Sequence, residues 1–226
     1  MPYVPSEKTI PPAEDRKIID AALEPVAQEA ATLIISNAAL LPAYKSVFMQ
    51  IAQYLTDLAS KTEAPKDSIG NLARAIFETG EKWGYEGAFL GELNYAMTRF
   101  IQRVPGIMVE LGKWKEKDEL RYWLYARTVS ALIYASRHTE NYGIGIDGVF
   151  EDIKDEYKRR VNTAYEAEQI VKSGDCYDAP YFTRLVEVVD DSGHVGYMEI
   201  MLKRTPMSSS RLRRDKDVLN RQIKLE

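Results

Sequence analysis

Apolar residues recur at steps of three and four through most of the first 172 residues, the spacing of one face of a helix. Pro25 inside the first such stretch is expected to kink or split it, and Pro105-Gly106 to end the fourth. The fifth is apolar nearly all round between Tyr122 and Ala135, which places it in the middle of a bundle. We predict helices over residues 13–37, 42–60, 69–77, 89–104, 116–137 and 149–172.

The hydrophobic period changes to 2 toward the C-terminus. Residues 181–189 and 195–203 are rich in β-branched and aromatic side chains and flank Asp190-Asp-Ser-Gly193, which predicts a β-hairpin. The first twelve residues carry four prolines without periodicity, which is typical of an extended arm. The predicted fold is therefore mainly α, a bundle of about six helices, with an N-terminal arm (1–12), helical bundle (13–178), C-terminal hairpin (179–204) and basic tail (205–226).

The composition narrows the chemistry. Of 226 residues, 45% are hydrophobic and 28% charged, as in globular proteins, and the net charge of −4 provides no bulk attraction to nucleic acid or anionic lipid. A single cysteine, Cys176, excludes a disulfide framework, and His138 and His194 are too few for a histidine zinc centre. Without an apolar run of eighteen residues or a signal sequence, we expect a soluble cytoplasmic protein that does not enter a membrane.

Two segments and the opening Met1-Pro2-Tyr3 carry a family resemblance. The segments are Gly91-Glu-Leu-Asn-Tyr-Ala-Met-Thr-Arg99 and a set of blocks between Gly148 and Tyr177. They resemble a family of small uncharacterised helical proteins found in bacteriophage and prokaryotic genomes. The resemblance as a whole covers about ninety residues in separated blocks. The resemblance implies a phage or prokaryotic setting, with the host cytoplasm or the virion as the location of a phage protein, and it implies little chemistry.

A glycine motif, Gly143-Ile-Gly145-Ile-Asp-Gly148, stands directly before the sixth predicted helix. A dinucleotide-binding G-x-G-x-x-G also requires a strand before it, and here the preceding element is a predicted helix. The pattern therefore favours a reversal of the chain between two long helices. A looser anion site at the helix start is the alternative.

Carboxylates cluster on the sixth predicted helix. Glu151 and Asp155 are four residues apart and share a face, as do Asp152 and Glu156. Carboxylates on facing helices hold Mg²⁺ in helical nucleotide pyrophosphohydrolases. The candidate partners are Glu78 with Glu81, Glu92, or Glu116 with Glu119. We favour the other interpretation, surface ion pairs from Asp155 to Arg159 and from Glu156 to Arg160.

A polar group on the fourth predicted helix is the third candidate site. Glu92, Tyr95 and Arg99 share one side of this helix. They either orient a phosphate or a base, or form a buried network to the sixth helix, for example from Arg99 to Glu151. We favour the network. The fourteen tyrosines are interpreted as core residues.

These features favour a non-enzymatic binding or assembly protein that acts through its arm, hairpin and tail. It would bind a protein partner or form a homo-oligomer, contact nucleic acid only through the tail, and need no cofactor. The alternative is a Mg²⁺-dependent nucleotide pyrophosphohydrolase-like enzyme using Glu151 and Asp155 with Glu78 and Glu81. A third hypothesis is a small-ligand or nucleotide binder without turnover, with Arg99, Arg159 or Arg160 in its cleft. Candidate partner contacts in the tail are Arg211, Arg213, Arg214, Leu219 and Ile223.

Overall fold

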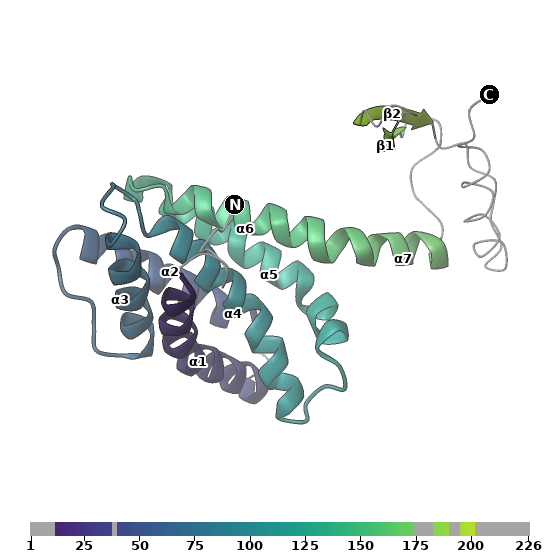
Figure 1. Ribbon diagram of the computed structural model, residues 1–226. Coiled ribbons are helices and arrows are strands. Elements are labelled where there is room, and N and C mark those ends of the chain that lie inside the picture. Colours follow the sequence, from purple (N-terminus) through teal and green to yellow (C-terminus); the bar gives the residue numbers. More distant parts are fainter. Residues whose placement is uncertain (1–11, 38–39, 174–182, 190–194, 202–226) are drawn as a thin grey trace. The chain divides into compact units, whose positions relative to one another are not determined.

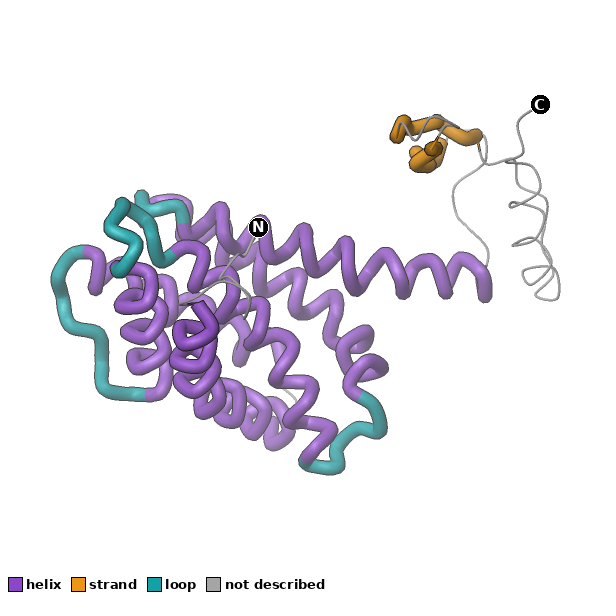
Figure 2. Tube along the Cα trace, viewed as in Figure 1, coloured by secondary structure: helices purple, strands orange, loops and turns teal. Residues whose placement is uncertain are grey.

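The computed structural model describes residues 12–37, 40–173, 183–189 and 195–201 (Figure 1). These residues are mainly helical, as expected from the sequence. The chain divides into two compact units, residues 1–165 and 166–226. The helices are α1 (Pro12–Asn37), α2 (Leu40–Ala59), α3 (Ser68–Glu81), α4 (Leu90–Glu110), α5 (Lys117–Thr139), a 3₁₀ turn η1 (Glu140–Tyr142), α6 (Ile146–Tyr157), a π-helical turn η2 (Lys158–Asn162) and α7 (Thr163–Ser173), coloured purple in Figure 2.

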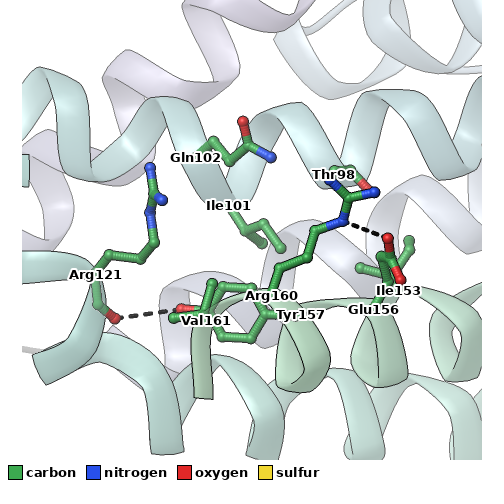
Figure 3. Close-up of a pocket in the computed structure, with 9 residues that line it drawn as sticks. All are labelled: Thr98, Ile101, Gln102, Arg121, Ile153, Glu156, Tyr157, Arg160 and Val161. Carbon is green, nitrogen blue, oxygen red and sulfur yellow. Dashed lines mark hydrogen bonds and ion pairs between the residues drawn. The ribbon is translucent and has the colours of Figure 1, made fainter. Parts of the chain in front are cut away.

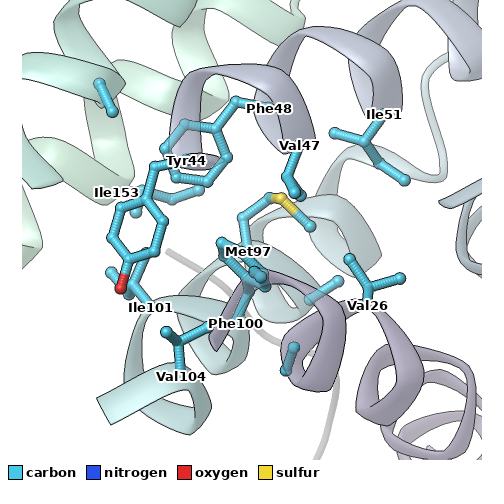
Figure 4. Packing of buried hydrophobic residues seen from close by; sticks show 14 of the residues in the cluster. Val26, Tyr44, Val47, Phe48, Ile51, Met97, Phe100, Ile101, Val104 and Ile153 are labelled. Carbon is cyan, nitrogen blue, oxygen red and sulfur yellow. The ribbon is translucent and has the colours of Figure 1, made fainter. Parts of the chain in front are cut away.

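The first unit is held together by a core in which α4 packs against α1, α3, α5 and α6. Phe48 of α2 lies at the centre of its aromatic part, with ring centroids 5.4 Å from Phe150 and 6.0 Å from Phe100. The ring of Tyr44 meets Phe100 edge to face at 5.4 Å (Figure 4). These four side chains are almost completely buried, so each contributes roughly 1.5–3 kcal/mol by leaving water.

Pro25 does not split the first helix, and the expectation that Pro105-Gly106 ends the fourth helix is wrong. Pro25 lies inside α1, and Pro105 lies inside α4, which continues to Glu110. In α4, Val104, Ile107 and Met108 are buried on both sides of the proline. Burial of these side chains therefore offsets the ~3 kcal/mol that an interior proline costs a helix.

The expectation that the fifth helix is surrounded by the bundle is also wrong. α5 packs against α2, α4 and α6, but Trp123, Arg127 and Ser130 on its remaining face are exposed. The apolar residues of this segment are partly tyrosines and a tryptophan, and such side chains line a surface as readily as they fill a core. The central position belongs to α4 instead.

The glycine motif reverses the chain, as predicted. Gly143 and Gly145 have φ angles of 73° and 77°, in the left-handed region that glycine adopts without strain. They lie between α5 and α6, which pack against each other. Gly148 is already inside α6.

The second unit contains two antiparallel strands, β1 (Thr183–Val189) and β2 (Val195–Met201), shown in orange in Figure 2. Their register pairs Thr183 with Met201 and Val189 with Val195. Several predicted features lie outside the described residues. They are the N-terminal arm up to residue 11, Cys176, the connecting turn at residues 190–193, His194 and the tail at 205–226. The tail contacts Arg211, Arg213, Arg214, Leu219 and Ile223 lie there too.

Candidate functional site

A cleft of 370 Å³ opens where α4, α5, α6 and η2 meet (Figure 3). Its size falls at the lower end of the range of small-molecule sites. The floor is apolar, formed by Ile101, Ile153 and Val161 with the ring of Tyr157. The polar lining residues are Thr98, Gln102, Arg121, Glu156 and Arg160.

The π-helical turn places two of the lining residues. In η2 the Thr163 N–H donates to the Lys158 carbonyl five residues earlier, so this turn is one residue wider than an α-helical turn. The Arg160 side chain reaches back to the Glu156 carboxylate, and Val161 packs inward. Such turns are frequent at functional sites.

Positive charge exceeds negative charge at the cleft. Glu156 accepts hydrogen bonds from both Arg159, at 2.7 and 2.8 Å, and Arg160. These two guanidinium groups lower the pKa of Glu156 to about 2, so the carboxylate is ionised at neutral pH. Arg121 pairs with Asp118, which does not line the cleft, at 3.5 Å. The lining itself therefore contains two arginines, Arg121 and Arg160, and one carboxylate, Glu156.

Arg121 has an unused hydrogen-bond donor. Its Nε atom is buried and has no acceptor among the described residues. Its backbone carbonyl accepts a hydrogen bond from the Tyr157 hydroxyl at 3.3 Å, and burial raises the pKa of Tyr157 to about 12. Figure 3 shows Arg160 extended toward Glu156, whereas the Arg121 guanidinium points away from that carboxylate. A buried donor without an acceptor costs about 1–3 kcal/mol, which a ligand oxygen would recover.

The predicted group on α4 forms a network, as favoured, but with α1 instead of α6. Tyr95 donates to Asp20 at 3.0 Å and Arg99 approaches the same carboxylate at 3.4 Å. The expected contact from Arg99 to Glu151 is wrong, because α1 covers this side of α4. One turn on, Arg103 binds Glu24 at 2.7 Å and lowers the pKa of that carboxyl to about 2.

Glu92 is separate from this network. Its side chain is buried and Oε2 has no hydrogen-bond partner among the described residues. Burial raises its pKa, partly opposed by hydrogen bonds to its own backbone and to Trp83. Asp15, also buried, contributes a second negative charge nearby and pairs with Lys82 at 2.6 Å.

The acidic residues proposed as metal ligands do not gather. Glu151 accepts from Ser136 at 2.8 Å and pairs with Lys154, and Asp155 lies 3.5 Å from the same lysine. Glu78 and Glu81 are exposed on α3. Within the described ranges, no group of three or more acidic, histidine or cysteine side chains is arranged to hold a metal ion. The geometry therefore favours the ion-pair interpretation of this helix.

One of the two predicted ion pairs is wrong. Glu156 binds Arg160, as predicted, but Arg159 also binds Glu156 and not Asp155. Positions three and four residues after Glu156 both lie next to it on the helix surface, so this carboxylate reaches both arginines. Arg159 and Arg160 were both candidate binding residues, and of the two only Arg160 lines the cleft.

The sequence interpretation missed Arg121 and Gln102. They lie on two different predicted helices, and only the packing of α4 against α5 and α6 brings them together. The sequence signal was weak: Arg121 precedes an apolar run, and Thr98 and Gln102 are four residues apart on one helix face.

The fold and the cleft define a small helical domain with a cleft lined by two arginines and one carboxylate. The chain matches the family described as a domain of unknown function, DUF6899, over residues 1–176, and it belongs to that family. This match confirms the expectation that the chain belongs to an uncharacterised family. It covers more of the chain than the segments 91–99 and 148–177 that carry the resemblance. No curated protein and no solved structure matches the chain. No helix among the described residues is long and apolar enough to cross a membrane.

Proposed function

We propose that this protein is a non-enzymatic binding protein that holds a small anionic ligand in the cleft between α4, α5 and α6. The observation that carries the proposal is the pair Arg121 and Arg160, which share a mixed apolar and polar pocket with a single carboxylate. A ligand with a phosphate or carboxylate group and an apolar body fits this lining. Its anionic oxygens accept hydrogen bonds from Arg121 Nε and from Arg160, and its apolar part covers Ile101, Ile153 and Tyr157.

Phenyl phosphate tests the cleft, and phenol serves as its uncharged counterpart. With a dissociation constant of ~1 mM, 10 mM phenyl phosphate adds about 1.4 kcal/mol of stability, which raises Tm by roughly 3–6 °C. Differential scanning fluorimetry measures this shift. We expect phenol to give less than a third of it, because phenol lacks the anionic group.

Arg160→Gln and Arg121→Gln are each expected to abolish most of the phenyl phosphate shift. Arg159→Gln is the matched control, since Arg159 binds the same Glu156 but does not line the cleft. If phenol and phenyl phosphate shift Tm equally, or if Arg159→Gln removes the shift as well, the cleft does not bind anions. Phosphate release from phenyl phosphate, or from a nucleoside triphosphate with Mg²⁺, would instead favour the enzyme alternative.

The binding function extends to assembly in this proposal. The protein is of phage or prokaryotic origin, and its arm, hairpin and tail contact a protein partner or a second copy of the chain. Three observations support this part: the family resemblance of residues 91–99 and 148–177, the two-stranded sheet whose outer edges are unpaired among the described residues, and the six basic against three acidic residues of the tail.

Sedimentation velocity of the full chain and of a chain lacking residues 205–226 tests the assembly. We expect the full chain to sediment as an oligomer whose fraction rises with concentration, and the shortened chain to shift toward the monomer. Identical sedimentation of the two chains would remove the tail from the proposal.

A further inference from the structure

The exposed face of α5 combines aromatic and basic side chains in a continuous row, separate from the cleft. Trp123, Arg127, Ser130, Tyr134 and Arg137 follow one another at steps of four and three, so they lie along one side of the helix. From Trp123 to Arg137 this row spans about 21 Å. Arg121, which lines the cleft, is two residues from Trp123 and therefore lies on another side of α5.

The connection before α5 adds to the row and is fixed in shape. α4 ends in a Schellman motif: Lys113 N–H donates to the Met108 carbonyl at 3.1 Å and Gly112 N–H to Val109 at 2.9 Å, with Gly112 at φ 69°. Lys113 is the last residue of this motif and begins the sequence Lys113-Trp114-Lys115, in which a partly buried tryptophan stands between two exposed lysines. The motif therefore fixes the backbone at this end of the row.

The two tryptophans of this region lie together. The rings of Trp114 and Trp123 are 5.5 Å apart, centroid to centroid, and 47% of Trp123 is exposed. The Arg127 guanidinium lies 4.8 Å from the Trp123 ring. Trp114 packs against the core, which orients the pair, and Trp123 presents its surface to solvent. An exposed indole beside a guanidinium forms a stacking surface for a planar ring.

Charge along the same face is mainly positive. At the far end, Lys45 of α2 lies 4.1 Å from the Tyr134 ring. With Lys45, the face carries five cations. The carboxylates that follow the same spacing are Glu119 in α5 and, at its two ends, Glu116 and Glu140. The lysines at 113 and 115 form no ion pair within the part of the chain that the structure describes. This local excess contrasts with the net charge of −4 for the whole chain.

We infer that this face binds single-stranded nucleic acid. We call it the α5 strip and define it by Lys113, Trp114, Lys115, Trp123, Arg127 and Tyr134. Phosphates pair with the row of cations, while a base stacks on Trp123. Proteins that bind single-stranded nucleic acid combine these two features, positive charge along the backbone and an aromatic ring for stacking. An acidic peptide would satisfy the cations but would leave the exposed indole without a planar partner. A duplex hides its base faces, so a single strand fits better.

Fluorescein-labelled dT₁₂ at 20 mM NaCl is the probe for the full-length protein. We expect the fluorescein anisotropy to rise to a plateau as protein is added, and the tryptophan fluorescence of the protein to be quenched by dT₁₂. We also expect the affinity to fall as the salt concentration rises. The chain has three tryptophans, Trp83, Trp114 and Trp123. Because residues 205–226 contain none, binding by the tail alone would not quench them.

Trp123→Leu is expected to weaken dT₁₂ binding about tenfold, the order of magnitude for one stacked base. Trp83→Leu is the matched control, because Trp83 is 45% exposed and lies in the connection between α3 and α4. The double change Lys113→Gln/Lys115→Gln is expected to reduce the salt slope by about 1.4, and Lys61→Gln/Lys66→Gln to leave it unchanged.

Three outcomes would overturn the inference. One is dT₁₂ binding without tryptophan quenching, which assigns the nucleic acid to the tail. Another is an equal loss in Trp83→Leu and Trp123→Leu. The third is tighter, Trp123-dependent binding of poly-glutamate than of dT₁₂, which assigns the α5 strip to an acidic protein partner.

Discussion

Replacing Phe48 with alanine is expected to lower the free energy of unfolding by about 3–5 kcal/mol. The Phe48 ring is fully buried and contacts the rings of Tyr44, Phe100 and Phe150, which come from α2, α4 and α6. Its removal leaves a cavity where three helices meet, and close-packed neighbours cannot collapse into that space. Urea unfolding followed by circular dichroism at 222 nm measures the loss.

Tyr85→Ala provides the control for Phe48→Ala. Tyr85 is also aromatic but is 65% exposed, so its removal is expected to change stability by less than about 0.5 kcal/mol. If the Phe48 variant lost less than about 1 kcal/mol, the aromatic cluster would not be the centre of the core.

Gly70→Ala is expected to lower the free energy of unfolding, whereas a change from glycine to alanine within a helix usually raises it. Alanine in a helix interior normally stabilises by about 1 kcal/mol relative to glycine. A Cβ atom at position 70 would lie 1.8 Å from the Pro65 carbonyl oxygen, a backbone atom that cannot move without displacing the turn before α3. We expect a loss of about 2–3 kcal/mol in urea unfolding, as for other overpacked sites.

Gly91→Ala is the matched control for the change at position 70. Gly91 lies in α4, and no atom lies within 4 Å of the position where its Cβ would be. This variant is expected to gain about 0.5–1 kcal/mol. If alanine raised the free energy of unfolding at both position 70 and position 91, the backbone of residues 61–67 would move easily to make room for the Cβ atom.

The sequence predicted the helices well where apolar spacing was regular. The third, fifth and sixth helices began within three residues of their predicted starts, because local spacing decides where a buried face begins. The errors arose where distant contacts decide. Val104, Ile107 and Met108 keep α4 helical past Pro105 through burial against other helices, which a local pattern does not reveal.

The cleft was less predictable than the fold. Arg160 was identified because an arginine pair follows an acidic cluster, a visible local pattern. Arg121 lines the cleft only because α5 packs against α4 and η2, and no local pattern shows these contacts. The helical spacing allows Arg159 to pair with either Asp155 or Glu156, and in the structure it pairs with Glu156. The α5 strip was hidden for a related reason: the tyrosines and tryptophan of this segment were counted as core residues.

The π-helical turn also has a consequence for length variation within the family. A π-helical turn holds one residue more than an α-helical turn, so a relative lacking one residue between 158 and 162 would form a regular α-helix there. The side chains after it would keep their directions around the helix axis, because the wide turn and the α-helical turn each complete one revolution. Tyr165, whose ring stacks on Tyr122 at 5.3 Å, would keep that partner. A relative with a gap of one residue in this segment is therefore expected to retain the contact between these two tyrosines.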